Sequence, residues 1–277
     1  MDILHIENLE KSFGQNKVLQ GISFTVPEGS IFGFIGGNGA GKTTTMKMVL
    51  GLLPPDKGDI YVCGEKVVYG NTKTNKYIGY LPDVPEYYNW MRPKEYLKLC
   101  GEITGMSPKA IKSRSQELLQ MVGLSKTKHK IGGFSRGMKQ RLGMAQALLN
   151  EPKLLICDEP TSALDPMGRK EILDILQEVK GKTTVIFSTH ILSDVERICD
   201  RATVLHKGKI ALCGSLQELR ARHSSSDTTI EFASGADKEK FLSLPEIGTL
   251  FHISGQTETS VTLSKGDFES LFLEVVA

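Results

Sequence analysis

Residues 36 to 43 read Gly-Gly-Asn-Gly-Ala-Gly-Lys-Thr, a pattern typical of loops that bind phosphate. The loop follows an apolar segment, 31 to 35, and precedes a helical pattern. Glycines let the backbone turn its N–H groups toward phosphate oxygens, and a helix N-terminus adds partial positive charge. We expect Lys42 to contact the β- and γ-phosphates of a nucleotide and the Thr43 hydroxyl to bind Mg²⁺. The alternative is a glycine-rich turn with an exposed lysine, which the flanking strand and helix disfavour.

A second candidate lies where the apolar segment 154 to 157 ends in two acids, Asp158 and Glu159. Parallel strands of α/β proteins end at the edge of the sheet where ligands bind. Because side chains alternate along a strand, the two carboxylates point in different directions. Asp158 could hold Mg²⁺ through water, while Glu159 could face the γ-phosphate and accept a proton from attacking water. The pair could instead cap the next helix, but the upstream phosphate loop favours catalysis.

The elements that must position these residues follow from hydropathy. Continuous apolar runs at 31–35, 154–157 and 183–188 predict strands buried on both faces, hence a largely parallel sheet covered by helices. Helical patterns cover 93–104, 108–122, 136–150, 166–180 and 191–199. The segments 2–7, 17–26 and 60–68 predict a β-rich flank. The fold class is therefore α/β.

A smaller C-terminal region is predicted after residue 222. Segment 223–228 contains three serines and is typical of a linker. Beyond it, 228–232 and 260–263 alternate like strands and 268–275 is helical in pattern. Residues 221–277 hold four Arg or Lys against nine Asp or Glu. We expect a main domain, 1–222, with a helical subdomain at about 84–150, followed by a small acidic α+β accessory domain, 223–277.

Composition excludes several classes of protein. The 277 residues are 40% hydrophobic and 24% charged, which is ordinary globular usage. No apolar run approaches the roughly 20 residues that cross a bilayer, and no secretory signal is recognisable, so we expect a cytoplasmic location. The five cysteines lie at least 14 residues apart, which excludes a CxxC redox pair or a clustered metal site.

Five motifs, in the order typical of the family, resemble those of ATP-binding subunits of ABC transporters, over about residues 1 to 220. The resemblance is closest to bacterial exporters of the ABC-2 and bacitracin-resistance type. Residues 36–43 are similar to the Walker A motif, 154–159 to Walker B, 162–165 to the D-loop and His190 to the switch histidine. Residues 134–138, Phe-Ser-Arg-Gly-Met, stand where the family has its LSGGQ signature.

The resemblance implies a P-loop NTPase core and an ATPase that uses ATP and Mg²⁺, with Glu159, His190 and Lys42 as catalytic residues. The implied metal-binding residues are Thr43 and Asp158. The implied ATP-binding residues are Phe13, Gly36, Gly37, Asn38, Gly39, Ala40, Gly41, Lys42, Thr43, Thr44, Ser135 and Gly137.

The signature departs from the family pattern at Phe134, Arg136 and Met138 but keeps Ser135 and Gly137. Ser135 could cap a helix and offer its hydroxyl, and Gly137 permits close backbone approach, so this end could bind a γ-phosphate. In the family that phosphate belongs to the ATP of the opposing subunit. An ordinary capped helix is the alternative.

Two further positions carry open alternatives. Asp83 stands where the family has the glutamine of the Gln-loop. An acid there could bind Mg²⁺ or water, or could simply belong to a Pro-Asp turn. Phe13 matches an aromatic position whose ring stacks on adenine, although core packing is possible.

The resemblance also implies partners. We expect separate transmembrane permease subunits, a homodimer with a heterodimer as the alternative, and a place at the inner face of the cell membrane. Tyr87, Tyr88 and Trp90 could contact the membrane subunit or pack within the helical subdomain. No nucleic acid partner is expected: a ribosome- or DNA-acting ATPase of this type usually has tandem ATPase domains or long coiled coils. A nucleotide sensor without hydrolysis is disfavoured by Glu159 and His190.

Overall fold

The computed structural model describes residues 2–223, 228–244, 247 and 252–264. The chain divides into two compact units, Met1–Ala211 and Leu212–Ala277. No helix in the described part of the chain is long and apolar enough to cross a membrane.

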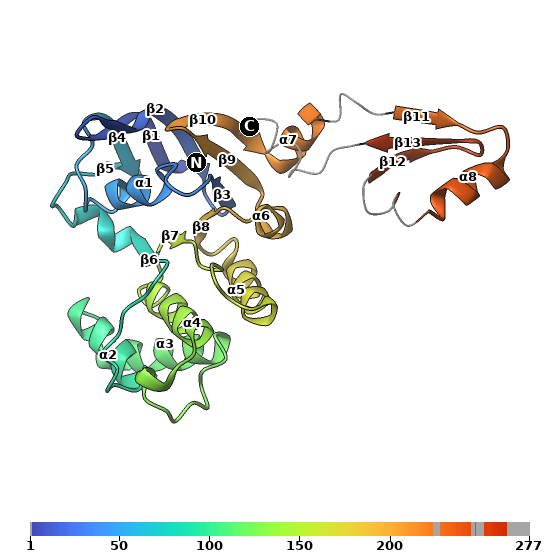
Figure 1. Cartoon of the computed structure of the whole chain (residues 1–277). Coiled ribbons are helices and arrows are strands. Elements are labelled where there is room, and N and C mark those ends of the chain that lie inside the picture. Colours follow the sequence, from blue (N-terminus) through green and yellow to red (C-terminus); the bar gives the residue numbers. More distant parts are fainter. Residues whose placement is uncertain (1, 224–227, 245–246, 248–251, 265–277) are drawn as a thin grey trace. The chain divides into compact units, whose positions relative to one another are not determined.

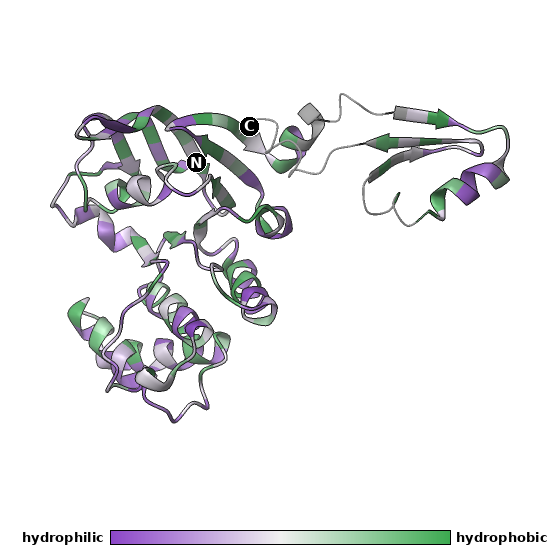
Figure 2. Ribbon diagram, viewed as in Figure 1, coloured by the Kyte–Doolittle hydropathy of each residue, from purple (hydrophilic) through white to green (hydrophobic). Residues whose placement is uncertain are grey.

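A six-stranded sheet forms the centre of the first unit, in the order β10-β9-β3-β8-β7-β6 (Figure 1). Its strands are β3 (Ile31–Ile35), β6 (Ile78–Leu81), β7 (Leu154–Asp158), β8 (Thr184–Thr189), β9 (Arg201–His206) and β10 (Lys209–Ser215). The pairs β6–β7, β7–β8, β3–β8 and β3–β9 are all parallel, which confirms the predicted, largely parallel sheet. Every residue of β3, β7 and β8 is buried, as continuous apolar runs require. Strand β9 of the same sheet is largely hydrophobic in Figure 2.

An antiparallel sheet, in the order β2-β1-β4-β5, confirms the predicted β-rich flank. Its strands are β1 (Asp2–Phe13), β2 (Asn16–Pro27), β4 (Lys57–Val62) and β5 (Glu65–Lys66). One hydrophobic core joins this sheet to the central one. Phe24 of β2 stacks on Phe32 and Phe34 of β3 with ring centroids 5.7 and 5.2 Å apart. The packed rings hold β3, and with it the loop at its end, in a fixed position.

The helices of the first unit are α1 (Lys42–Val49), η1 (Lys73–Tyr77), α2 (Pro93–Ile103), α3 (Pro108–Met121), η2 (Ile131–Gly133), α4 (Arg136–Ala147), α5 (Pro166–Val179) and α6 (Leu192–Ile198). Helices α2, α3 and α4 contact one another and form a separate helical group in Figure 1. Helix α4 ends at Ala147, earlier than the predicted residue 150. The cause lies just beyond, where Glu151 has a left-handed φ of 50° and Pro152 cannot continue a helix.

The second unit contains α7 (Leu216–His223), β11 (Thr228–Glu231), α8 (Gly235–Leu242), β12 (His252–Gln256) and β13 (Ser260–Ser264). The strands form an antiparallel sheet in the order β11-β13-β12, with a small core of Ile247, Val261 and Leu263. The predicted strands at 228–232 and 260–263 coincide with β11 and β13, whereas α8 and β12 were not predicted. The predicted helix at 268–275 lies outside the described residues.

Candidate active site

Two glycines of the loop between β3 and α1, Gly36 and Gly41, leave little or no room for a side chain. A Cβ atom on Gly36 would lie 2.6 Å from the backbone oxygen of Leu205. Gly41 precedes α1 with φ of 112°, and a Cβ atom there would lie 2.7 Å from Leu19 Cδ2. The loop therefore has to follow one path from β3 into the helix N-terminus.

Lys42 lies at the start of α1 and is only 6% exposed. Its Nζ donates hydrogen bonds to Gly36 O at 2.6 Å and Gly37 O at 3.3 Å. The same ammonium group lies 3.0 Å from Glu159 Oε1. The fold thus brings two of the predicted catalytic residues into an ion pair and holds the lysine across the loop.

Asp158 ends β7 and is held by two hydroxyl groups. Thr43 Oγ1 donates to Asp158 Oδ2 at 2.8 Å, and Ser188 Oγ donates to Asp158 Oδ1 at 2.6 Å. Asp158 is 2% exposed and Ser188 is fully buried. The sequence-based prediction missed Ser188. Its signal was a polar residue near the end of β8, which pairs with β7 so that Asp158 lies opposite Ser188.

Glu159 begins the turn after β7 in an unusual backbone conformation, with φ of 49°. Such strain costs on the order of 1–3 kcal/mol and persists only where surrounding contacts impose it. Here Glu159 N donates to Ser188 O at 3.0 Å. Glu159 Oε2 lies 2.9 Å from His190 Nδ1 and accepts a hydrogen bond when that nitrogen carries a proton. The two predicted catalytic side chains are therefore neighbours.

The oxygen atoms at this site fit a magnesium nucleotide. Buried Glu159 Oε1 accepts no hydrogen bond from the described residues, despite its ion pair with Lys42. Thr43 and Asp158 supply a hydroxyl and a carboxylate, the hard donors that Mg²⁺ prefers. The described part of the chain contains no group of three or more His, Cys, Asp or Glu side chains that could hold a metal ion. Mg²⁺ commonly uses one or two carboxylates together with substrate phosphates, so this donor set suits it.

Phe13 ends β1 and is 51% exposed, which argues against the core-packing alternative. Lys11 Nζ lies 5.5 Å from the ring centroid and 2.7 Å from Asp56 Oδ1. Asp56 Oδ2 also accepts a hydrogen bond from Ser12 N at 2.6 Å. Lys11 and Ser12 together lower the pKa of the Asp56 carboxyl. These contacts fix the chain just before the ring, and stacking on adenine stays a prediction.

The signature residues lie at the start of α4, where Ser135 is the N-cap. Ser135 Oγ accepts a hydrogen bond from Met138 N at 3.2 Å, as the predicted cap requires. Ser135 and Arg136 are exposed and Gly137 is half-buried. Within the part of the chain that the structure describes, no hydrogen bond or ion pair joins Ser135 to Lys42 or Asp158. Within one subunit, the signature serine therefore makes no polar contact with these two residues of the predicted phosphate and metal site.

Asp83 follows β6 and contacts the signature helix. Arg136 Nη2 lies 3.3 Å from Asp83 Oδ1, and Gln140 Nε2 donates to Asp83 O at 2.6 Å. Burial raises the pKa of the Asp83 carboxyl, while Arg136 acts against that shift. The expected metal-binding role of Asp83 thus competes with an arginine that already pairs with its carboxylate.

The aromatic residues after Asp83 divide into two groups. The Tyr87 hydroxyl donates to Lys139 O at 2.6 Å, and its ring meets Tyr96 edge-on with centroids 5.0 Å apart. Tyr88 and Trp90 are 55% and 64% exposed. Tyr87 therefore packs within the helical group, whereas Tyr88 and Trp90 are accessible to a partner.

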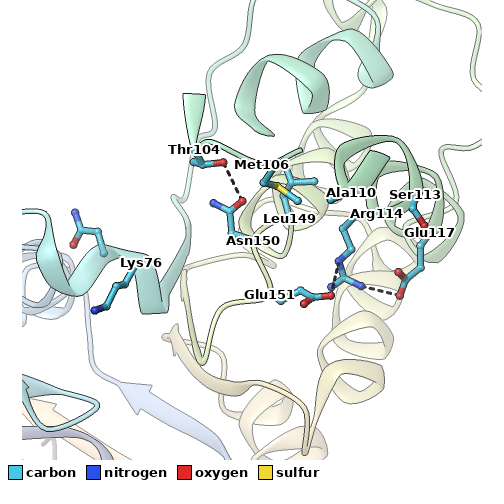
Figure 3. Close-up of a pocket in the computed structure, with 11 residues that line it drawn as sticks. Lys76, Thr104, Met106, Ala110, Ser113, Arg114, Glu117, Leu149, Asn150 and Glu151 are labelled. Atoms are coloured by element: carbon cyan, nitrogen blue, oxygen red, sulfur yellow. Dashed lines mark hydrogen bonds and ion pairs between the residues drawn. The ribbon is translucent and has the colours of Figure 1, made fainter. Parts of the chain in front are cut away.

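A separate cavity of about 690 Å³ lies between η1, α3 and the end of α4 (Figure 3). Arg114, Glu117 and Glu151 line this cavity. The Arg114 guanidinium lies 2.7 Å from the Glu117 carboxylate and 3.9 Å from the Glu151 carboxylate. Thr104 donates to Asn150 at 3.0 Å across the same cavity. None of the predicted nucleotide-binding residues lines it, and its arginine is already paired. The cavity is therefore not the candidate active site.

The chain was compared with known proteins. Residues 19–162 match the sequence profile of the family described as ABC transporter. The chain is 45% identical over 229 residues to the uncharacterised ABC transporter ATP-binding protein YxlF of Bacillus subtilis (strain 168), an alignment covering 82% of this chain and 76% of YxlF. It is 38% identical to the Nod factor export ATP-binding protein I of Rhizobium sp. (strain N33), over 92% of this chain and 84% of that protein.

Among solved structures, cbiO1 of Clostridium perfringens, part of the ABC transporter complex cbiONQ, has a TM-score of 0.75. It is 29% identical in sequence, and the match covers 90% of this chain and 98% of cbiO1. The matched family, the architecture and the ordered motifs agree. The chain belongs to the ABC transporter family as an ATP-binding subunit, an ATPase whose hydrolysis of ATP is coupled to transport.

Proposed function

We propose that two copies of this chain form a dimer around two Mg²⁺-ATP molecules and supply energy to a separate membrane permease. The carrying observation is that one chain contains two half-sites that no hydrogen bond or ion pair joins among the described residues. The buried half contains Lys42 and Asp158 together with the partly buried Glu159, and the exposed half contains Ser135 together with the half-buried Gly137. A head-to-tail dimer would complete each buried half with the signature of the partner. A homodimer suffices because one chain carries both halves.

At each site the residues would have distinct roles. Lys42 would bind the β- and γ-phosphates, which would replace Gly36 O and Gly37 O as partners of its ammonium group. Thr43 and Asp158 would hold Mg²⁺, which offsets negative charge on the phosphates when bound. Glu159 would accept the proton of the attacking water. His190 Nδ1 lies 2.9 Å from the Glu159 carboxylate and would orient that carboxylate.

The partner surface is proposed on the helical group. Tyr88 and Trp90 lie exposed and 6.0 Å apart by ring centroids, an arrangement suited to an apolar contact with a permease subunit. Export is the proposed direction, supported by a relative named for Nod factor export. The subunit would then act at the cytoplasmic face of the membrane. The nucleotide-binding domain is proposed to cover residues 1–222, and 223–277 to form an accessory domain.

Mixed dimers test this proposal. One protomer carries Lys42→Ala and its tagged partner carries Ser135→Arg, after each variant has been shown inactive as a homodimer. The control pairing joins wild type to the double variant Lys42→Ala/Ser135→Arg. Phosphate release is measured on isolated mixed dimers together with the membrane partner.

If the signature acts on the opposite subunit, the first pairing keeps one intact site and the control has none. Activity should therefore appear only in the first pairing. Activity only in the control pairing would place both halves in one subunit and contradict the head-to-tail dimer. If neither pairing releases phosphate, hydrolysis needs two intact sites. The geometry is then decided by measuring ATP-dependent dimerisation of Glu159→Gln protein with and without Ser135→Arg.

A further inference from the structure

Two departures from the family pattern meet in space. Asp83 replaces the glutamine of the Gln-loop, and Arg136 replaces a glycine of the signature. These residues are 53 positions apart, yet Arg136 Nη2 and Asp83 Oδ1 lie 3.3 Å from each other. Both side chains are about half exposed. The two departures from the family pattern therefore lie in contact and carry opposite charges.

The ion pair adds to a backbone contact that is already ordered. Gln140, which is fully buried, donates its side-chain amide to Asp83 O at 2.6 Å. One turn further on, a Cβ atom on Gly143 would lie 2.5 Å from Leu81 Cδ1 and 2.8 Å from the Tyr87 hydroxyl. Segment 81–87 thus lies tightly along α4. Because the backbone is held, the Asp83 and Arg136 side chains lose less conformational freedom on pairing than two isolated surface residues would.

The charges near Asp83 explain why the carboxylate needs a partner. Burial is the main cause that raises the pKa of the Asp83 carboxyl; Arg136 lowers this pKa by attraction, Asp158 and Glu159 raise it by repulsion, and His190 lowers it. Arg136 offsets the charge of the carboxylate without occupying Thr43 or Asp158, which bond to each other.

We propose that Asp83 and Arg136 form a positioning pair that holds the signature residues Ser135 and Gly137 in place relative to the end of β6. In this role Asp83 is not a metal ligand, and Arg136 acts through Asp83 rather than on phosphate. The pair rests on the proposed dimer, because the signature has to present Ser135 to the nucleotide of the partner. An exposed ion pair contributes little to global stability, so its effect is on the placement of the signature.

The test uses full-length protein carrying Glu159→Gln as the parent, with Asp83→Arg, Arg136→Asp and the charge swap Asp83→Arg/Arg136→Asp added. ATP-dependent dimerisation is measured by sedimentation, and ATP binding is measured separately at concentrations where the protein is monomeric. Each single reversal should weaken dimerisation about tenfold and leave monomer ATP affinity unchanged. The swap should recover most of the loss. Glu102→Gln, which breaks an exposed ion pair with Lys98 in α2, is the matched control and should change nothing.

The opposite pattern would overturn the pair. If the swap stays as weak as Arg136→Asp while Asp83→Asn is neutral, Arg136 acts on phosphate directly. If Asp83→Asn changes the affinity for Mn²⁺ in the presence of ATP, Asp83 is a metal ligand. Hydrogen exchange of the ATP-free monomer tests the contact without any dimer: Asp83→Asn should speed exchange in the first turn of α4. If the parent itself fails to dimerise, the dimer proposal fails, and unchanged exchange would then refute the pair as well.

Discussion

The two halves of the proposed site are built in different ways. Lys42 and Asp158 are 6% and 2% exposed and are held by the ends of buried parallel strands. Ser135 and Arg136 lie exposed at the start of a helix, held by one cap and by contacts to segment 83–87. This difference indicates that the fold of one subunit preorganises the proposed chemistry of the buried half. The exposed half stays accessible to the nucleotide of the proposed partner.

Burial explains why the first half tolerates little change. Asp158 accepts two hydroxyl hydrogen bonds where water cannot replace a lost donor, so each missing partner leaves an unsatisfied buried charge. Around Ser135, water can replace lost hydrogen bonds. Substitutions in the buried half should therefore abolish chemistry, and those in the exposed half should alter association and local stability.

The largest effect should come from Glu159→Gln. The amide keeps the shape of the side chain but cannot accept a proton, so turnover should fall roughly 10²- to 10⁴-fold. Phosphate release measured with the membrane partner checks the loss, and ATP binding by the same protein controls for folding. Near-normal hydrolysis would show that another residue acts as the general base.

Ser188→Ala should have the next largest effect. It removes the donor to Asp158 Oδ1 and should reduce affinity for the divalent metal about 10- to 100-fold. Titration of Mn²⁺ by electron paramagnetic resonance in the presence of ATP measures that affinity directly. Ser193→Ala is the control, because it removes a hydroxyl on α6 that accepts a hydrogen bond from Arg169 of α5. Equal metal affinity in the two variants would show that Asp158 does not depend on Ser188.

Ser135→Ala sharpens the comparison through a matched helix cap. Ser107 caps α3 in the same manner, accepting from Ala110 N at 3.3 Å. Loss of either cap should lower the free energy of unfolding by about 1 kcal/mol, measured by urea denaturation. Only Ser135→Ala should also weaken ATP-dependent dimerisation. Equal dimerisation in the two variants would reduce Ser135 to an ordinary cap.

The smallest effect should follow from removal of residues 224–277, because every recognised motif precedes the cut. The truncated protein should bind ATP with unchanged affinity, as measured with a fluorescent nucleotide on monodisperse protein. Circular dichroism would verify that the remaining chain is folded. Loss of ATP binding in folded, monodisperse protein would make the C-terminal region part of the site.

Much of the fold and of the candidate site could be predicted from residues that are adjacent in sequence. The loop 36–43 is recognisable by itself, since the glycines, lysine and threonine that are expected to act on the phosphates and Mg²⁺ of one nucleotide are adjacent in sequence. Asp158 and Glu159 are recognisable because a buried strand ends directly before them. The parallel sheet follows from continuous apolar runs, and the helix starts at Ser107, Ser135 and Asp165 follow from local capping chemistry.

Contacts between distant residues were decided only by the tertiary structure. Ser188 lies 30 positions from Asp158, and Arg136 and Gln140 lie 53 and 57 positions from Asp83. No local pattern specifies such pairs, because strand order in the sheet and the packing of α4 determine which polar groups meet. The sequence alone left Asp83 between metal ligand and turn residue, and Tyr87 between partner contact and core packing. The fold placed Asp83 beside Arg136 and Tyr87 against Tyr96, because segment 81–87 packs against the helices that carry Arg136 and Tyr96.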